Sequence, residues 1–445
     1  MTVRMSGADV AWLRMERPTN PMVITAVLVF KTRLSLARTK QTLRRRFLAF
    51  DRFRQRPVEL ATGFYWEFDE TFDLDRHVHR VALPAPGDKQ ALETLVSDLA
   101  SAPLDPSQPM WQFYVVDGYG RGRGALVVRM HHCYADGVAL MRVLLAITEG
   151  GSSLPKRRAA AAGGWEGWLP WLEPLAKAGA GILFEVLLHP GKALDYVQAG
   201  ASALAEAARL LAMSPEPKTR FRGALGTSKR VAWCDPLPLA RVKALGKALG
   251  CTVNDVLLAA AAGALRAYLA SHRDPVQGLE IRVVVPVNLR PADSEEPLGN
   301  EFGLVFLQLP LGVANPIARV HAVRTRMQAL RNSPQPVLML GLLGFAGQAP
   351  RALQEQLLDV LGAHATAVMT NVPGPRKRLR FAGAEIEQQM FWVPQAGDIA
   401  MGASILSYAG RVQFGLMTDV AMVRDPERIA ARFPGEIEKL QEAVA

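Results

Sequence analysis

Two periods of hydrophobic and polar positions alternate along the chain: the two-residue period of strands and the 3.6-residue period of helices. In the first 150 residues, runs of β-branched and aromatic residues predict strands at 22–30, 65–72, 111–117 and 125–130. Apolar residues at every third or fourth position predict helices at 36–50, 89–102 and 137–149. This part of the chain is therefore expected to mix strands with helices.

The same mixture resumes near residue 221. Strands are expected at 279–287, 302–311, 365–371 and 405–417, and helices at 237–249, 253–272, 316–331 and 426–443. Between the two halves, residues 150–164 are rich in Gly, Ser and Ala, which indicates a linker, and an alanine- and leucine-rich stretch follows to residue 213. We therefore expect a mixed α/β chain with an N-terminal lobe at 1–150, a linker with bridging helices at 151–220, and a C-terminal lobe at 221–445.

Composition agrees with a folded globular chain. Of the 445 residues, 49% are hydrophobic and 21% charged, and this length suits two or three domains. Cys133, Cys234 and Cys251 are too few and too far apart for a disulfide framework or a metal site, which favours a reducing compartment. The N-terminus lacks the pattern of a signal peptide, and no run of about 18 apolar residues occurs. We therefore expect a cytoplasmic protein without a transmembrane helix or a metal.

The net charge of +11 attracts polyanions, a class that includes nucleic acids, anionic membranes and phosphorylated cofactors. No helix-turn-helix, zinc-finger or basic-aromatic repeat is visible, so nucleic acid is not expected as a partner. Trp165, Trp168 and Trp171 follow a basic triplet at 156–158 and suit an interface with lipid. The alternative for these indoles is ordinary packing of a helix between the lobes.

The segment 129–140 carries the clearest candidate chemistry. An expected strand ends at His131 and His132, and Asp136 and Gly137 precede an expected helix. Histidine suits proton transfer because its ordinary pKa of about 6.5 is close to working pH. Asp136 is placed to cap the helix, and Gly137 lets the chain turn closely. The alternative is a satisfied core histidine beside an ordinary capping aspartate.

The pattern His-His-x-x-x-Asp-Gly at 131–137 resembles the signature of the CoA-dependent acyltransferase superfamily, which includes chloramphenicol acetyltransferase, carnitine acyltransferases and peptide-synthetase condensation domains. Other segments are similar, in order, to blocks of the bacterial wax ester synthase/diacylglycerol acyltransferase family: residues 5–22, 103–111, 253–256, 285–290, 299–300 and 371–375. Met110 stands where that family's Pro-Leu-Trp block has leucine. The resemblance spans most of the chain and is weakest between about 150 and 221.

The resemblance implies two chloramphenicol-acetyltransferase-like lobes with a tunnel between them, joined here by the helical linker. It implies an O-acyltransferase that moves a fatty acyl group from acyl-CoA to a long-chain alcohol or diacylglycerol, giving wax ester or triacylglycerol. His132 would remove the acceptor proton and His131 would support it. No bound cofactor is implied, since acyl-CoA is a co-substrate.

Further residues receive roles from this resemblance. Asn254 would stabilise the oxyanion from the start of an expected helix, although Asn254 or Asp255 could instead cap that helix. Asp136 would pair with an arginine and shape the loop. Arg54 is the preferred partner and Arg290 is the alternative.

A rigid turn at 371–375 is followed by a basic cluster. Its residues are candidates for binding the substrate or the phosphates of CoA: Asn371, Gly374, Arg376, Lys377 and Arg378. The alternative is a solvated basic loop. Two other functions stay open: a condensation-type enzyme that takes its acyl group from a carrier protein, and a non-catalytic protein of lipid surfaces. The chain is expected in the cytoplasm, with peripheral association with the inner membrane face or lipid droplets as a further interpretation.

Overall fold

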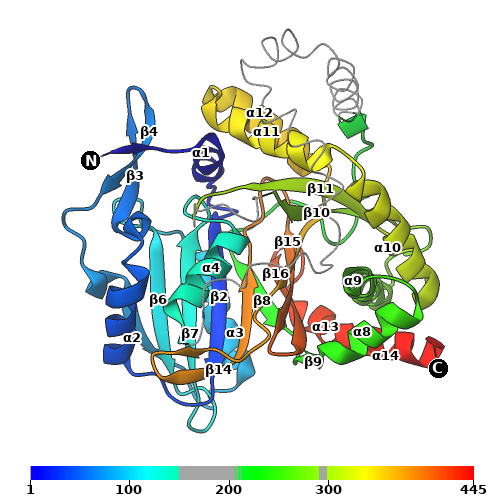
Figure 1. Cartoon of the computed structure of the whole chain (residues 1–445). Coiled ribbons are helices and arrows are strands. Elements are labelled where there is room, and N and C mark those ends of the chain that lie inside the picture. The colour runs from blue at the N-terminus through cyan, green and yellow to red at the C-terminus, as the bar shows by residue number, and fades with distance from the viewer. Residues whose placement is uncertain (1, 150–205, 207–208, 211, 290–297, 445) are drawn as a thin grey trace, which may run out of the picture.

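The computed structural model describes residues 2–149, 206, 209–210, 212–289 and 298–444. Within them the chain forms two large sheets with helices on their faces, arranged side by side (Figure 1). The mixed α/β prediction with two lobes is thus confirmed. Most of the expected linker, its tryptophans and Arg290 lie outside the described residues.

The sheet of the N-terminal lobe has the strand order β13-β14-β2-β7-β6-β5. Its strands are β13 (Arg380–Phe381), β14 (Ala384–Trp392), β2 (Val23–Phe30), β7 (Gly124–His131), β6 (Trp111–Asp117) and β5 (Val78–Ala82). Helix α3 (Lys89–Ser101) packs on one face through Leu92 and Val96. Helix α4 (Gly137–Ile147) covers the other face together with Phe47. The predicted strand at 65–72 is β4 (Gly63–Phe68), which belongs to a separate small sheet with β3 (Gln55–Leu60) and β1 (Val3–Arg4).

Strand β14 lies in this sheet although it comes from the last quarter of the sequence. It pairs antiparallel with β2, for example Phe391 with Ala26, and buries Met390 and Trp392. The division of the chain into lobes at residue 221 stays a prediction, but the sheets do not follow it. The sequence analysis missed β14 because Glu385, Glu387 and two glutamines obscure its alternation.

The second sheet has the order β11-β10-β12-β15-β16-β8, with β9 beside β16. Its strands are β11 (Phe302–Leu309), β10 (Ile281–Asn288), β12 (Ala367–Pro373), β15 (Met401–Tyr408), β16 (Arg411–Asp419), β8 (Lys229–Trp233) and β9 (Leu237–Pro238). The helices that share its core are α8 (Leu239–Ala248), α9 (Val253–Ser271), α10 (Pro316–Arg331), α13 (Pro426–Ala430) and α14 (Arg432–Val444). By length and composition α9 could cross a membrane, but 72% of its most apolar window is buried, as in a core helix.

Two predicted elements are wrong in their boundaries. Residues 405–417 do not form one strand but parts of the hairpin β15–β16, because Ala409 and Gly410 both take positive φ and turn the chain. The closing helix is divided into α13 and α14. The sequence analysis did not predict α11 (Gln335–Gln348) or α12 (Arg351–Ala363).

Helix α1 (Gly7–Arg14) packs against α11, which brings the start of the chain onto the C-terminal half (Figure 1). The approach is close because both helices present glycines. A Cβ atom at Gly347 would overlap the carbonyl oxygen of Gly7, and one at Gly7 would overlap that of Gly344. The N-terminal lobe is completed by α2 (Leu36–Thr42), η1 (Leu43–Phe47), η2 (Asp51–Arg54) and η3 (Leu74–Arg76).

Candidate active site

His132 stands in the loop between β7 and α4 and is only 4% exposed. Its backbone N–H donates to the carbonyl of Met22 over 2.7 Å, which ties the loop to the start of β2. The ring stacks on Trp12 of α1, with centroids 4.0 Å apart and planes at 23°. The ring of Phe302 of β11 is a second neighbour, with its centroid 5.8 Å from that of the imidazole and its plane tilted by 52°. Three distant parts of the chain therefore fix this imidazole.

Burial determines the protonation state of His132. The loss of hydration lowers the pKa of its ring to about 3, and the neighbouring His131 adds to the effect. Its own carbonyl oxygen and the Asn300 side chain favour the protonated ring and oppose the shift in part. Neither forms a well-aligned hydrogen bond with Nδ1, which is enclosed by protein. The ring is therefore neutral at pH 7, the form that can accept a proton.

Asp136 acts as the expected helix cap. Its Oδ1 accepts the backbone N–H groups of Val138 over 3.0 Å and Ala139 over 2.8 Å. Its Oδ2 accepts the N–H of Glu301 over 3.0 Å, and its own N–H donates to the carbonyl of Gly299. Asp136 thus joins the histidine loop to the segment 299–301, and these bonds occupy both carboxylate oxygens with backbone groups.

Asn300 is a site residue that the sequence analysis matched to a family block without giving it a role. Its Nδ2 donates to the carbonyl oxygen of His132 over 3.0 Å and to Oδ1 of Asp9 over 2.8 Å. Asp9 is 3% exposed, and burial raises the pKa of its carboxyl group. One amide therefore connects α1, the histidine loop and the entry to β11. The sequence could not show this connection, because 291 residues separate Asn300 from Asp9 and only the fold brings them together.

His131 forms a hydrogen bond within the loop, and its role in supporting His132 stays a prediction. Its Nδ1 accepts the backbone N–H of Cys133 over 3.2 Å, so its proton belongs on Nε2. That nitrogen lies 3.3 Å from Oε2 of Glu16, an ion-pair distance without good hydrogen-bond alignment. Glu16 also accepts the N–H of Met22. His131 is therefore held toward Glu16.

The expected pairing of Arg54 with Asp136 is wrong. Arg54 pairs with Asp51 over 2.5 Å, three residues earlier on the same 3₁₀ turn, and lies over the ring of Phe68. Arg52 is the member of this turn that faces the site, since its Nη1 is 3.8 Å from Oδ2 of Asp9. The other candidate, Arg290, lies outside the described residues.

The segments that contain Asn254 and Asn371 come together in the fold. Asn254, in the first turn of α9, accepts a 2.7 Å hydrogen bond at Oδ1 from Nδ2 of Asn371 on β12. The capping alternative holds for Asp255, which exchanges hydrogen bonds with Thr252 in a capping box. Asn254 is therefore not the cap. Because its oxygen is occupied, the N–H groups of its amide are left to donate.

The basic cluster after the turn at 371–375 is exposed. Arg378 is bound to Glu385 over 2.7 Å, so it is not free for a phosphate. Arg376 and Lys377 are exposed, and no ion pair is found for them within the described residues. Gly374 lies against β15, where its N–H donates to the carbonyl of Ser407 over 2.8 Å.

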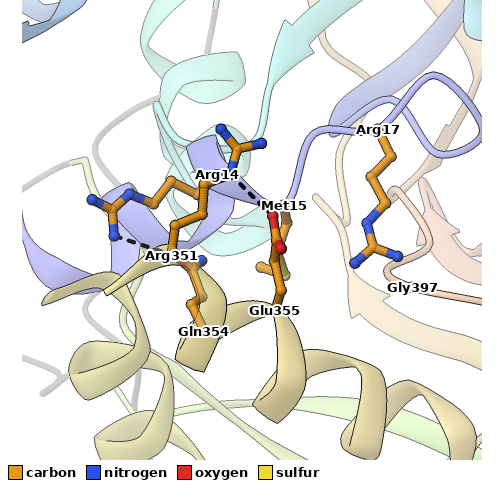
Figure 2. A pocket seen from close by; sticks show the side chains of 7 residues that line it. All are labelled: Arg14, Met15, Arg17, Arg351, Gln354, Glu355 and Gly397. Atoms are coloured by element: carbon orange, nitrogen blue, oxygen red, sulfur yellow. Dashed lines mark hydrogen bonds and ion pairs between the residues drawn. The ribbon is translucent and has the colours of Figure 1, made fainter. Parts of the chain in front are cut away.

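A small polar pocket lies between α1 and α12, where Figure 2 shows three arginines around it. Arg14 donates to the carbonyl of Ala349 over 2.8 Å. Arg351 pairs with Glu355 over 3.0 Å, and Arg17 lies on the opposite side. Nη1 of Arg14 also donates to Oε1 of Gln354 in α12 over 3.4 Å. The two bonds of Arg14 attach the end of α1 to the junction of α11 and α12, so they help to fix the helix that carries Trp12.

An apolar cavity of about 120 Å³ lies between α4 and the N-terminal sheet. Its lining includes Met130, just before the two histidines, and Gly137, just after Asp136. The expectation that Gly137 permits a close turn is wrong, because its φ is not positive and no atom lies within 4 Å of where its Cβ would stand. Gly137 instead leaves open space at the end of the cavity nearest the histidine loop.

In the part of the chain that the structure describes, no group of three or more His, Cys, Asp or Glu side chains is placed to hold a metal ion. The three cysteines are free, and burial raises the pKa of the Cys133 and Cys234 thiols.

Two family models match the sequence in succession. The wax ester synthase/diacylglycerol acyltransferase catalytic domain matches residues 5–257, and the C-terminal domain of the same family matches residues 298–441. A putative diacylglycerol O-acyltransferase of Mycobacterium tuberculosis strain ATCC 25618 / H37Rv is 30% identical over 418 residues, covering 87% of this chain and 85% of the relative. A probable diacylglycerol O-acyltransferase of the same strain is 28% identical over 399 residues, covering 87% and 83%.

Solved structures share the fold. The wax ester synthase/diacylglycerol acyltransferase from Marinobacter aquaeolei VT8 superposes with a TM-score of 0.70 at 22% identity over 99% of both chains. The starter condensation domain of rhizomide synthetase, solved with C8-CoA and Leu-SNAC, gives a TM-score of 0.60 at 14% identity and covers 100% of this chain and 94% of that one. At these identities the likeness concerns the fold.

Proposed function

The chain belongs to the wax ester synthase/diacylglycerol acyltransferase family, and from that premise we propose that His132 is the general base of its acyl transfer. The reaction moves a fatty acyl group from acyl-CoA to the hydroxyl of a long-chain alcohol or diacylglycerol. The product is a wax ester or a triacylglycerol. The observation that carries the proposal is a buried imidazole beside an apolar cavity, stacked on Trp12 in a loop whose backbone is held by Met22 and Asn300.

The enclosure of Nδ1 leaves Nε2 as the nitrogen that can meet a substrate hydroxyl. Nε2 takes the acceptor proton while the alcohol oxygen forms its bond to the thioester carbon. The C–S bond then breaks, and the proton passes to the departing thiolate of CoA. General-base assistance of this kind contributes about 10²–10⁴-fold. Asp136 takes part by fixing the loop through backbone bonds rather than by orienting the ring.

Asn254 is the proposed donor to the oxyanion of the tetrahedral intermediate. Its amide oxygen is held by Asn371, which orients its N–H groups, and the start of α9 adds the positive end of a helix dipole. One such donor contributes about 3–4 kcal/mol to a transition state of this type. Asn371 is then a positioning residue.

The proposal extends to the CoA moiety and to location. Arg376 and Lys377 are exposed beside the turn at 371–375 and have no ion pair within the described residues, so they suit a phosphate of CoA. The net charge of +11 is consistent with a cytoplasmic protein that attaches peripherally to an anionic membrane face or to lipid droplets.

The decisive assay uses radiolabelled palmitoyl-CoA with hexadecanol and, separately, dioleoylglycerol. We expect His132→Ala to lose ester formation by about a hundredfold or more. His321→Ala, which removes an exposed histidine of α10, is the matched control and should keep full activity. Circular dichroism and thermal unfolding confirm that the variants are folded.

Full activity in a folded His132→Ala variant would make the histidine structural and end the proposal. No ester from the wild-type protein with either alcohol would favour the condensation-type alternative, in which a carrier protein delivers the acyl group. The ratio of the two products with active enzyme identifies the acceptor.

A further inference from the structure

The cavity beneath α4 contains one feature that an ordinary hydrocarbon site does not need. Gln389 of β14 is the single polar side chain in its lining among the described residues. It is 4% exposed, and neither its Oε1 nor its Nε2 has a hydrogen-bond partner. An unsatisfied buried polar group costs about 1–3 kcal/mol, so such a group is uncommon unless something binds it.

Sheet register shows that the side chain faces the cavity. Gln389 is opposite Leu28, and directly opposite residues point to the same face of a sheet. Leu28 lines the cavity and belongs to the core that α4 covers. The preceding residue, Gln388, is opposite Val29, which packs in the core on the α3 side.

The strand register also gives the distance of Gln389 from the two histidines along the sheet. On β2, Val23 is opposite His131 and Leu28 is opposite Gln389, five residues farther along. At about 3.4 Å per residue, the amide lies roughly 17 Å along the strand from the level of the histidines. The cavity runs from Gly137 at the near end toward Gln389, so a long alkyl chain that starts beside His132 extends toward this amide.

Gly374 explains how the amide is accommodated. A Cβ there would lie 3.2 Å from Nε2 of Gln389 and would overlap the carbonyl of Ser407. The turn at 371–375 therefore passes close to the Gln389 amide, and a residue larger than glycine at position 374 would crowd that amide. This gives Gly374, an expected substrate-binding residue, a role in shaping the space around Gln389.

We propose that this cavity binds the alkyl chain of a substrate and that Gln389 selects chains that carry a hydroxyl group far from the reacting end. A hydroxyl can donate to Oε1 and accept from Nε2, so it satisfies both halves of the amide. The inference rests on the proposed acyl transfer. The chain can belong to the acyl donor or to the alcohol, since both are long alkyl groups.

The test compares chains with and without a hydroxyl. In the donor arm, stearoyl-CoA and 12-hydroxystearoyl-CoA react with hexadecanol, and 2-hydroxystearoyl-CoA controls for depth. In the acceptor arm, octadecanol and 1,12-octadecanediol react with stearoyl-CoA. In one arm we expect wild-type kcat/KM to favour the 12-hydroxy chain about tenfold, the value of one buried hydrogen bond. The 2-hydroxy chain should show no such preference.

Gln389→Leu should abolish that preference and improve kcat/KM for the plain chain, because the unpaired amide is gone. Gln388→Leu is the matched control on the opposite face and should behave as wild type. Equal preference in wild type and Gln389→Leu, in both arms, overturns the inference.

Equilibrium titration of the same acyl-CoAs and alcohols, each without its co-substrate, separates this inference from the proposed reaction. If the wild-type protein forms no ester but binds the 12-hydroxy chain more tightly in a way that Gln389→Leu abolishes, the inference stands while the proposed function fails. If esters form but neither the affinities nor the rates depend on Gln389, the inference fails alone.

Discussion

The substitution Gly347→Ala tests whether the contact between α1 and α11 positions the active site. The new methyl would overlap the carbonyl oxygen of Gly7 and would lie 3.0 Å from the amide nitrogen of Ala11. Non-bonded heavy atoms prefer about 3.5–4.0 Å, so α1 must move by on the order of 1 Å. The same helix carries Trp12, which stacks on His132, and Asp9, which holds Asn300.

Two effects of this substitution can be estimated. Overpacking costs about 1–3 kcal/mol of stability, and the better helix propensity of alanine returns about 1 kcal/mol. Displacement of a positioning group by about 1 Å can lower the rate on the order of 10²-fold. We therefore expect kcat to fall on the order of a hundredfold, while the free energy of unfolding falls by no more than about 2 kcal/mol.

The assay measures kcat with palmitoyl-CoA and hexadecanol, together with urea unfolding. Gly341→Ala is the matched control, since it lies on the same helix and its Cβ would meet no atom within 4 Å. The control should be as active as wild type and as stable or slightly more stable. Wild-type kcat in Gly347→Ala would show that the α1–α11 contact does not position the imidazole.

Four further outcomes are expected. Asn300→Ala leaves the His132 carbonyl and a buried carboxylate without their donor, so urea unfolding should show a loss of about 1–3 kcal/mol for each. Gly137→Leu fills the end of the cavity nearest the histidine loop, so kcat/KM should fall about tenfold or more for the long chain that the cavity binds, palmitoyl-CoA or hexadecanol, and little for the corresponding four-carbon substrate. Because the pKa of His132 is lowered in the folded protein, the unfolded chain binds a proton at this residue at a higher pH than the folded protein does. The free energy of unfolding should therefore fall as the pH is lowered from about 6.5 to about 3. Between these two pH values, the free energy of unfolding in urea should depend on pH less steeply for His132→Ala than for the wild type, by about 1.4 kcal/mol per pH unit. Lys229→Met leaves Asp419 buried without its 2.8 Å partner and should cost about 3–5 kcal/mol, which denaturation measures.

Local chemistry in the sequence was enough to predict the local structure of the histidine loop at 131–137. A strand, two histidines, an aspartate at a helix start and a glycine are all set by neighbours in the chain, and Asp136 caps α4 as its position predicts. The mixed α/β class also follows from periodicity, since strands and helices with strong alternation were found within a few residues of their ends. Such features depend on short-range backbone geometry, which each segment determines for itself.

Long-range contacts could not be predicted in this way. Arg54 was preferred as the partner of Asp136, but an aspartate three residues away holds it, and Arg52 faces the site instead. Asn300 and Trp12 reach His132 only because α1 and β11 fold against the same loop. Strand β14 was missed because its polar residues hide the alternation of its buried ones.

The sequence by itself therefore determined the mixed α/β class, the strongly periodic elements, the family and the identity of the candidate base. Tertiary structure decided the electrostatic state of that base, since burial and not residue type lowers the pKa of His132. It also decided which side chains surround the alkyl cavity. Gln389 is polar in the sequence like its neighbour Gln388, and only the pairing of β14 with β2 turns one amide into the cavity and the other away.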